Sequence, residues 1–375
     1  MKAFLTVVLL TSTASAQVDQ KRIDAAIKKG VEWLKTAPSP GHEHSKAEHS
    51  DELILLTMIH AEVRESDPRY KALLKRVLED PPYQTYKVAL QAMCLEEIDR
   101  VKYQPRIAQC AQHLVDNQCS NGQWSYGTPT TYKEIPPQPP DVASGAPVKK
   151  PGAIDFGAVK VKPKVQRKIP IKAQRDGGGE GDNSNSQYAA LGLRACFDAG
   201  ISFEEAVIVR ATKWWMESQH APEDGGDKNA VASGGDARPR GWGYKGAGDG
   251  KAYGSMTAGA VGGVVIYDYM LKKDWKKNPI ANAGMSWLNV KWSVNNNPER
   301  GGDWHYYYLY GLERAGILYD TNMIGKHDWY LEGAKLLLDA QDAGGSWKNE
   351  TWDTCFAILF LKKATRPLVA TGGGK

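Results

Sequence analysis

The chain has 375 residues and a formal net charge of +5, from 48 Lys and Arg against 43 Asp and Glu. The positive charge is local: nine basic residues between Lys149 and Arg175 stand against one acid, a net of +8, which leaves −3 for the rest of the chain. A basic surface over the whole protein, of the kind that binds nucleic acid, is therefore excluded. No apolar run reaches the roughly 20 residues needed to span a bilayer, so we expect no membrane span.

The N-terminal residues 1–16 have the pattern of a secretory signal peptide. Lys2 precedes a mostly apolar run from Ala3 to Leu10, and small residues follow up to Ala14, Ser15 and Ala16. An Ala-x-Ala sequence after a short apolar run is a typical cleavage site. We therefore predict a secreted or periplasmic protein that starts near Gln17.

Apolar residues recur every three or four positions along most of the chain, which is the helical period. This spacing predicts six helical hairpins in two parts, residues 17–127 and 184–369, followed by a frayed tail at 370–375. The twelve helices are expected at residues 20–36, 50–63, 68–79, 84–97, 103–117, 186–199, 203–218, 255–271, 280–290, 303–316, 327–341 and 350–363.

The predicted helices alternate between two kinds. The helix at 203–218 carries charges on one face only, whereas the segment 258–266 is apolar on every side. A helix that is apolar all round must be covered all round. The alternation predicts an all-α fold, an (α/α)6 double ring or toroid, whose inner helices begin near Ser50, Thr85, Asn185, Ser255, Asp303 and Glu350.

Residues 128–183 interrupt the helical pattern. They are rich in Pro, Gly and Lys and have no apolar period, which predicts a disordered, loosely attached insert. Its basic residues could act as a solvated tether, or could contact an anionic polymer of the cell envelope.

The five cysteines, Cys94, Cys110, Cys119, Cys196 and Cys355, have no metal-ligand spacing. An odd number leaves at least one free thiol or an intermolecular pair. Cys94, Cys196 and Cys355 lie in apolar helical stretches, where we expect them to act as small buried apolar residues.

A short motif returns at the joints between hairpins. It begins with a glutamine, passes through glycine and ends in tryptophan, at Gln118 to Trp124, at Gln341 to Trp347, and in a longer copy from Gln219 to Trp242. In physical terms the glutamine can bond free backbone groups at a helix end, glycine can turn the chain, and tryptophan can seal the next hairpin.

These copies resemble the Gln-Trp repeats of the squalene and hopene cyclases, which also occur in toroids of the protein prenyltransferase type. The resemblance implies a terpenoid cyclase-like fold and a structural role for the repeat residues. Class II cyclases of that family use an Asp-x-Asp-Asp run to protonate an alkene, and no such run occurs in this sequence. The resemblance therefore does not imply cyclase activity.

No cofactor is predicted, although one zinc site can be considered. Prenyltransferases hold zinc with an Asp and a Cys two residues apart and with a His, which Asp353, Cys355 and His305 resemble in reversed order. The alternative is that Asp353 is a favourable charge in the first turn of a helix. His42, His44 and His49 could likewise share a metal or belong to a solvated loop.

The first residues of the inner helices are expected to converge at one end of the ring, where polar and aromatic side chains suit a small-molecule site. His305 and Asp353 are the catalytic candidates there. The alternatives are a toroid that binds an apolar or glycan-like ligand, a secreted isoprenoid-handling or polysaccharide-cleaving enzyme, and an envelope scaffold. The expected cavity residues are Asp51, Glu52, Tyr86, Asn185, Gln187, Tyr253, Thr257, His305, Tyr307 and Trp352.

Overall fold

The computed structural model describes residues 19–38, 51–136, 162, 164–223 and 238–368. The expected signal peptide (1–16), the tail at 370–375 and the histidines at positions 42, 44 and 49 lie outside these residues. In the described part, no helix is both long and apolar enough to cross a membrane.

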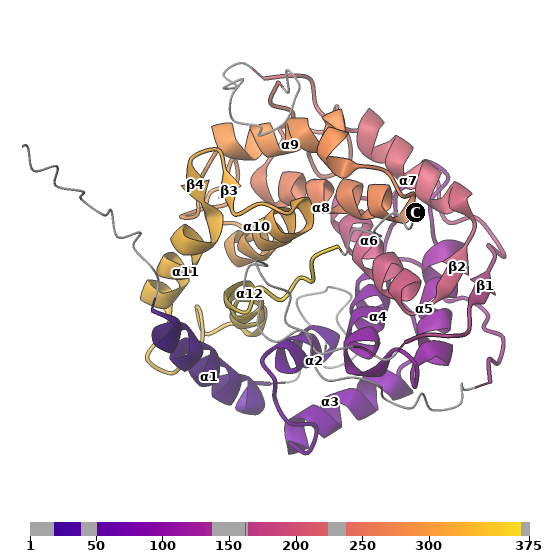
Figure 1. Ribbon diagram of the computed structural model, residues 1–375, viewed down its shortest axis with the longest axis horizontal. Helices are drawn as coiled ribbons and strands as arrows, with labels where there is room; N and C mark the ends of the chain where they lie inside the picture. The colour runs from indigo at the N-terminus through magenta and orange to yellow at the C-terminus, as the bar shows by residue number, and fades with distance from the viewer. Residues whose placement is uncertain (1–18, 39–50, 137–161, 163, 224–237, 369–375) are drawn as a thin grey trace, which may run out of the picture.

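Twelve α-helices in the described residues form two concentric rings (Figure 1). The inner helices are α2 (Asp51–His60), α4 (Thr85–Asp99), α6 (Asn183–Asp198), α8 (Gly254–Met270), α10 (His305–Tyr319) and α12 (Thr351–Leu361). The outer helices are α1 (Gln20–Thr36), α3 (Pro68–Glu79), α5 (Gln104–Asp116), α7 (Glu205–Glu217), α9 (Pro279–Val290) and α11 (Trp329–Ala340).

Each inner helix packs against the inner helix before it and after it, and α12 packs against α2, so the inner ring is closed. Burial follows the two kinds of sequence. Every residue of α8 from Gly254 to Asp268 is buried, whereas α3 buries only Tyr70, Leu73 and Val77. The prediction of an all-α toroid with alternating inner and outer helices is thus confirmed.

Two short strand pairs were not expected from the sequence. β1 (Ile169–Ile171) pairs in parallel with β2 (Ile201–Phe203), and β3 (Met323–Ile324) pairs in antiparallel fashion with β4 (His327–Asp328). Segments of two or three residues are too short to show an alternating apolar pattern.

The prediction that residues 128–183 form a loosely attached insert is wrong for the described ends of that segment. The side chains of Ile169 and Ile171 are buried in the core, and Lys162 forms ion pairs with Glu96 and Glu97. Gln174 donates its backbone N–H to Asp116, at 2.8 Å. These contacts tie the segment to the ring. Residues 137–161 and 163 lie outside the described part of the chain.

Because β1 is packed, Ile171→Ala should lower the free energy of unfolding by about 2–4 kcal/mol. Lys172→Ala, at the exposed neighbouring position, should change it by less than about 0.5 kcal/mol. Urea denaturation of both variants measures the difference. Equal, negligible effects would mean that β1 does not contribute to the core.

The three Gln-Trp joints make the same hydrogen bonds. The side-chain amides of Gln118, Gln219 and Gln341 each donate to a carbonyl in the first two turns of the next outer helix, at 2.8–3.0 Å. The indoles of Trp124, Trp242 and Trp347 each donate to a carbonyl near the end of the preceding outer helix, at 2.7–2.9 Å. The motif therefore fastens consecutive outer helices to each other.

Glycine is required in these joints for a steric reason. Gly122 and Gly345 have φ values of 95° and 97°, which disfavour other residues. A Cβ at Gly122 would lie 2.4 Å from the carbonyl oxygen of Arg210, and one at Gly345 would lie 2.6 Å from that of Lys29. The turns thus approach the next outer helix too closely for any side chain.

The segment that follows α12 crosses the end of the ring where the inner helices terminate (Figure 1). Thr365 donates its backbone N–H and its hydroxyl to the two carboxylate oxygens of Glu313, and Arg366 pairs with Glu97. The carbonyl of Pro367 accepts from Arg194. These contacts with α4, α6 and α10 place the C-terminal segment across that end.

All five cysteines are buried and free, so the structure holds none of them in a disulfide.

Candidate functional site

A pocket of about 480 Å³ opens at the end of the ring where the inner helices begin, within the ~300–1,000 Å³ usual for ligand sites. We call it the rim pocket. Half of its lining residues are aromatic, and the others include hydroxyl groups and charges of both signs. It is lined by Tyr86, Tyr126, Ser184, Tyr244, Lys245, Asp249, Tyr253, Ser255, Met256, Arg300, Asp303, Trp304, Tyr307 and Phe356.

Three hydroxyl groups from three inner helices are linked in this pocket. The Tyr86 hydroxyl of α4 bonds to Ser184 Oγ of α6, which lies 3.0 Å from the Tyr307 hydroxyl of α10. Burial raises the pKa of both tyrosines well above the usual range. The three linked hydroxyl groups therefore stay protonated at neutral pH, and they can both donate hydrogen bonds to a ligand and accept hydrogen bonds from it.

Packed aromatic rings below these hydroxyl groups form the floor of the pocket. The Tyr307 ring packs edge-on against Phe356, with centroids 5.6 Å apart, and stacks on Tyr188 at 6.1 Å. Paired rings of this kind are well ordered and contribute beyond their buried area.

Trp304 stands at the pocket mouth in an unusual state. It precedes α10, its backbone has a φ of 56°, and half of its surface is exposed. The left-handed region is uncommon for residues other than glycine, and such strain gathers at functional sites. Tyr126, which is 42% exposed, provides a second accessible ring.

The loop before α10 is held by the fully buried Asn297. Its Oδ1 accepts the backbone N–H of Ser255 at 2.9 Å, and its Nδ2 donates to the carbonyl of Asp303 at 3.0 Å. Gly254 allows the loop to come this close, because a Cβ there would lie 2.5 Å from Pro298. Asn297 thus fixes the loop that carries Arg300 and Trp304.

The charged groups lie above the aromatic floor. The Arg300 guanidinium covers the ring of Tyr253, with its central carbon 4.4 Å from the ring centroid. Asp249 Oδ2 accepts the backbone N–H of Lys245 at 2.9 Å. With Asp303, the pocket has two acids and two bases and so no net formal charge.

Of the ten residues that the sequence places in a cavity, the structure brings Tyr86, Tyr253 and Tyr307 together in the rim pocket. Asp51 instead pairs with Arg76 of α3, at 2.6 Å. Trp352 is partly buried against the core and does not line the pocket.

Four further predicted cavity residues are buried in the protein interior. Thr257 Oγ1 accepts the backbone N–H of Trp242, so it belongs to a Gln-Trp joint. Asn185 donates to Asp182, the N-cap of α6. Gln187 bonds to Arg314 deep in the ring, and Glu52 is completely buried. These residues lie on helix faces that turn towards neighbouring helices, which spacing along the chain cannot reveal.

The catalytic and metal candidates also lie outside the rim pocket. His305 Nε2 is 2.7 Å from the carbonyl of Val294, and burial lowers the pKa of His305. Burial raises the pKa of Asp353 to about 6, although Lys348 opposes this. Cys355 is buried. In the described residues, these three side chains do not gather into a group that could hold a metal ion.

Sequence reasoning missed most of the lining because it considered only the first turns of the helices. Tyr126, Tyr244 and Trp304 lie in the loops that lead into inner helices. The available signal was an aromatic residue within a polar, glycine-rich loop, as in the stretch that contains Tyr244 and Asp249.

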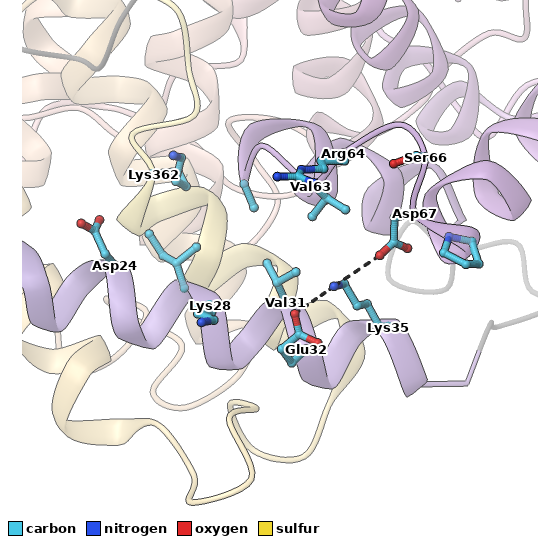
Figure 2. A pocket seen from close by; sticks show the side chains of 13 residues that line it. Asp24, Lys28, Val31, Glu32, Lys35, Val63, Arg64, Ser66, Asp67 and Lys362 are labelled. Carbon is cyan, nitrogen blue, oxygen red and sulfur yellow. Dashed lines mark hydrogen bonds and ion pairs between the residues drawn. The ribbon is translucent and has the colours of Figure 1, made fainter.

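A larger hollow of about 830 Å³ lies elsewhere, between α1 and the loop that joins α2 to α3 (Figure 2). Three of its charged side chains pair with one another: Lys35 lies 2.8 Å from Glu32 and 3.3 Å from Asp67. Since it has no exposed aromatic ring and lies on the outer surface, we place the site at the rim pocket despite the difference in volume.

Neither a model of a known protein family nor a curated protein matches the chain in sequence. Among solved structures, the chain is similar to the type II terpene cyclase MstE from Scytonema in its apo form. The identity is 11%, the match covers 92% of this chain and 99% of that chain, and the TM-score is 0.50. At this identity the likeness concerns the fold alone. The chain therefore has the toroid fold of the terpenoid cyclases, as the Gln-Trp repeats indicated.

Proposed function

We propose that this protein is a secreted toroid that binds a glycan-like ligand in the rim pocket. The observation that carries the proposal is Trp304, whose ring is half exposed at the pocket while its backbone is held in the left-handed region. An exposed, rigid aromatic face beside polar groups suits the flat apolar face of a sugar ring, whose hydroxyls need partners at its edge.

The polar groups favour a glycan over an isoprenoid. Tyr86, Ser184 and Tyr307 offer linked hydroxyls, and Asp249 and Asp303 offer carboxylates. Covering the two exposed carboxylates with a hydrocarbon would cost several kcal/mol, because they would lose their hydrogen bonds to water. A sugar would replace those bonds. Secretion rests on the N-terminal pattern at residues 1–16.

The test is isothermal titration of the mature protein with cellohexaose, chitohexaose and laminarihexaose. The oligosaccharide that binds wild type should bind Trp304→Ala about tenfold more weakly, since the lost ring contact corresponds to about 1.4 kcal/mol. Alanine keeps the same backbone constraint as tryptophan, so the variant should fold normally.

Tyr83→Ala is the matched control, because Tyr83 is 51% exposed but does not line the pocket. Its affinity should equal that of wild type. Equal weakening of both variants would remove the rim pocket as the site. If shorter oligosaccharides appear in the samples, the protein cleaves its ligand, and Asp249 and Asp303 would supply the pair of carboxylates that glycoside hydrolysis uses.

A further inference from the structure

Arg314 is a buried cation of the inner ring, in contact with residues of α6 and α10. It lies in the third turn of α10 and is only 2% exposed. In the described part of the chain no carboxylate lies within ion-pair distance of its guanidinium. Glu313, the adjacent residue, instead uses both carboxylate oxygens to accept from Thr365.

The contacts of Arg314 are too few for a buried charge. Nη2 donates to Gln187 Oε1 at 2.9 Å, and the guanidinium carbon lies 4.3 Å from the ring centroid of Tyr310 and 5.4 Å from that of Tyr188. Nη1 has no hydrogen-bond partner. A hydrogen bond to the Gln187 amide, a contact with the Tyr310 hydroxyl and two ring faces are all interactions with neutral groups, and they return less than the solvation that a buried ion loses.

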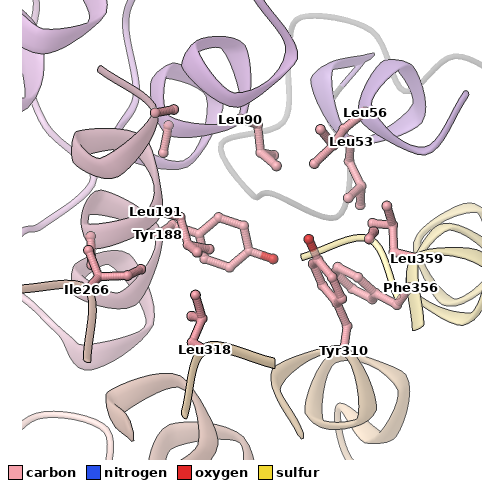
Figure 3. Close-up of a cluster of buried hydrophobic side chains, with 14 of the residues drawn as sticks. Leu53, Leu56, Leu90, Tyr188, Leu191, Ile266, Tyr310, Leu318, Phe356 and Leu359 are labelled. Atoms are coloured by element: carbon pink, nitrogen blue, oxygen red, sulfur yellow. The ribbon is translucent and has the colours of Figure 1, made fainter. Parts of the chain in front are cut away.

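The glutamine that accepts from Arg314 carries a second unused donor. Gln187 Nε2 is buried and has no partner. The amide packs against α8, where a Cβ at Gly259 would lie 2.1 Å from Gln187 Oε1 and 2.7 Å from Nε2. Figure 3 shows the hydroxyls of Tyr188 and Tyr310 pointing into the centre of the ring, among leucines from α2, α4, α10 and α12.

From this geometry we infer that the ring centre binds a small monovalent anion, a halide or a carboxylate of the size of formate, held by Arg314 Nη1 and Gln187 Nε2. An acceptor with a negative charge satisfies both donors and neutralises the guanidinium. The site lies beneath the rim pocket, because Tyr307 of the pocket floor stacks on Tyr188. It does not depend on the glycan proposal.

The experiment follows thermal unfolding of the full chain while chloride, bromide or formate replaces gluconate, an anion too large for the site, at constant ionic strength. The wild-type melting temperature should rise by a few degrees and then saturate, as expected for a ligand that binds only the folded state. In crystals, bromide should lie beside Arg314 Nη1.

Two variants separate this site from general salt effects. Gln187→Glu supplies the missing negative charge, so it should melt higher than wild type in gluconate and no longer respond to the small anions. Arg314→Met removes the charge and should not respond either, whereas Tyr83→Ala, at an exposed position outside the rim pocket, should respond like wild type. If wild type does not respond, or if all four proteins respond equally, the site holds water only and the inference is wrong.

Discussion

Trp347→Ala should lower the free energy of unfolding by about 3–5 kcal/mol, the usual cost of removing a large buried aromatic side chain. The Trp347 ring is fully buried, and it contacts α1 so closely that a Cβ at Gly30 would lie 2.9 Å from it. The substitution also leaves the Leu337 carbonyl without its indole donor, which adds to the loss. Chemical denaturation should show a lower midpoint with an unchanged slope.

The same substitution at Trp304 is the control for this prediction. Because Trp304 is half exposed, its removal should cost less than about 1 kcal/mol. Trp124→Ala and Trp242→Ala should resemble Trp347→Ala, since all three indoles make the same bond to the preceding outer helix. If all four variants lose the same small amount, the repeat does not hold the ring together.

Glu52→Gln should stabilise the protein by about 3 kcal/mol at pH 8 and by almost nothing below pH 4.5. Glu52 is completely buried, burial raises its pKa to about 7, and its Oε2 atom has no hydrogen-bond partner. Between about pH 4.5 and pH 7 the unfolded chain releases this proton but the folded chain keeps it. Stability therefore falls as the pH rises through this window and levels off above it.

Other buried groups titrate in the same range, so the comparison must be made between variants. Burial raises the pKa of Glu313 to about 7, which has the same sign, and lowers that of His60 to about 4. The His60 term acts in the opposite direction, because stability is lost as the pH falls from about 6.5 to about 4. The difference between the free energies of unfolding of wild type and Glu52→Gln at each pH removes both contributions.

For Asp51→Asn, one residue away, we expect the opposite change in the free energy of unfolding. Asp51 accepts from Arg76, so loss of its charge should lower stability at pH 8. A gain in both variants would point to the net charge of α2 rather than to the burial of Glu52.

The ring could be predicted from the sequence because its pattern is long and repeated. The period of apolar residues in α8 and the contrast with α3 extend over whole helices, and the joints at Trp124 and Trp347 repeat the same residues. An inner helix is covered on every side, so its apolar composition is sufficient to predict that it is buried.

The candidate site was only partly predictable. The helix directions predict which end of the ring holds the rim pocket, and for this reason Tyr86, Tyr253 and Tyr307 are among the predicted cavity residues. Trp304 was missed because its exposure depends on a left-handed backbone that tertiary contacts impose on the loop. Arg314 could not be predicted as a site residue, because a single charge in a mostly apolar helix does not reveal its partners.

The most direct measurement is the crystal structure of the protein with the oligosaccharide that binds it in titration. We predict a sugar ring stacked on Trp304, with its hydroxyls bonded to the chain formed by Tyr86, Ser184 and Tyr307. A sugar bound instead in the larger hollow between α1 and the loop that joins α2 to α3, with the rim pocket unchanged, would contradict the proposed function.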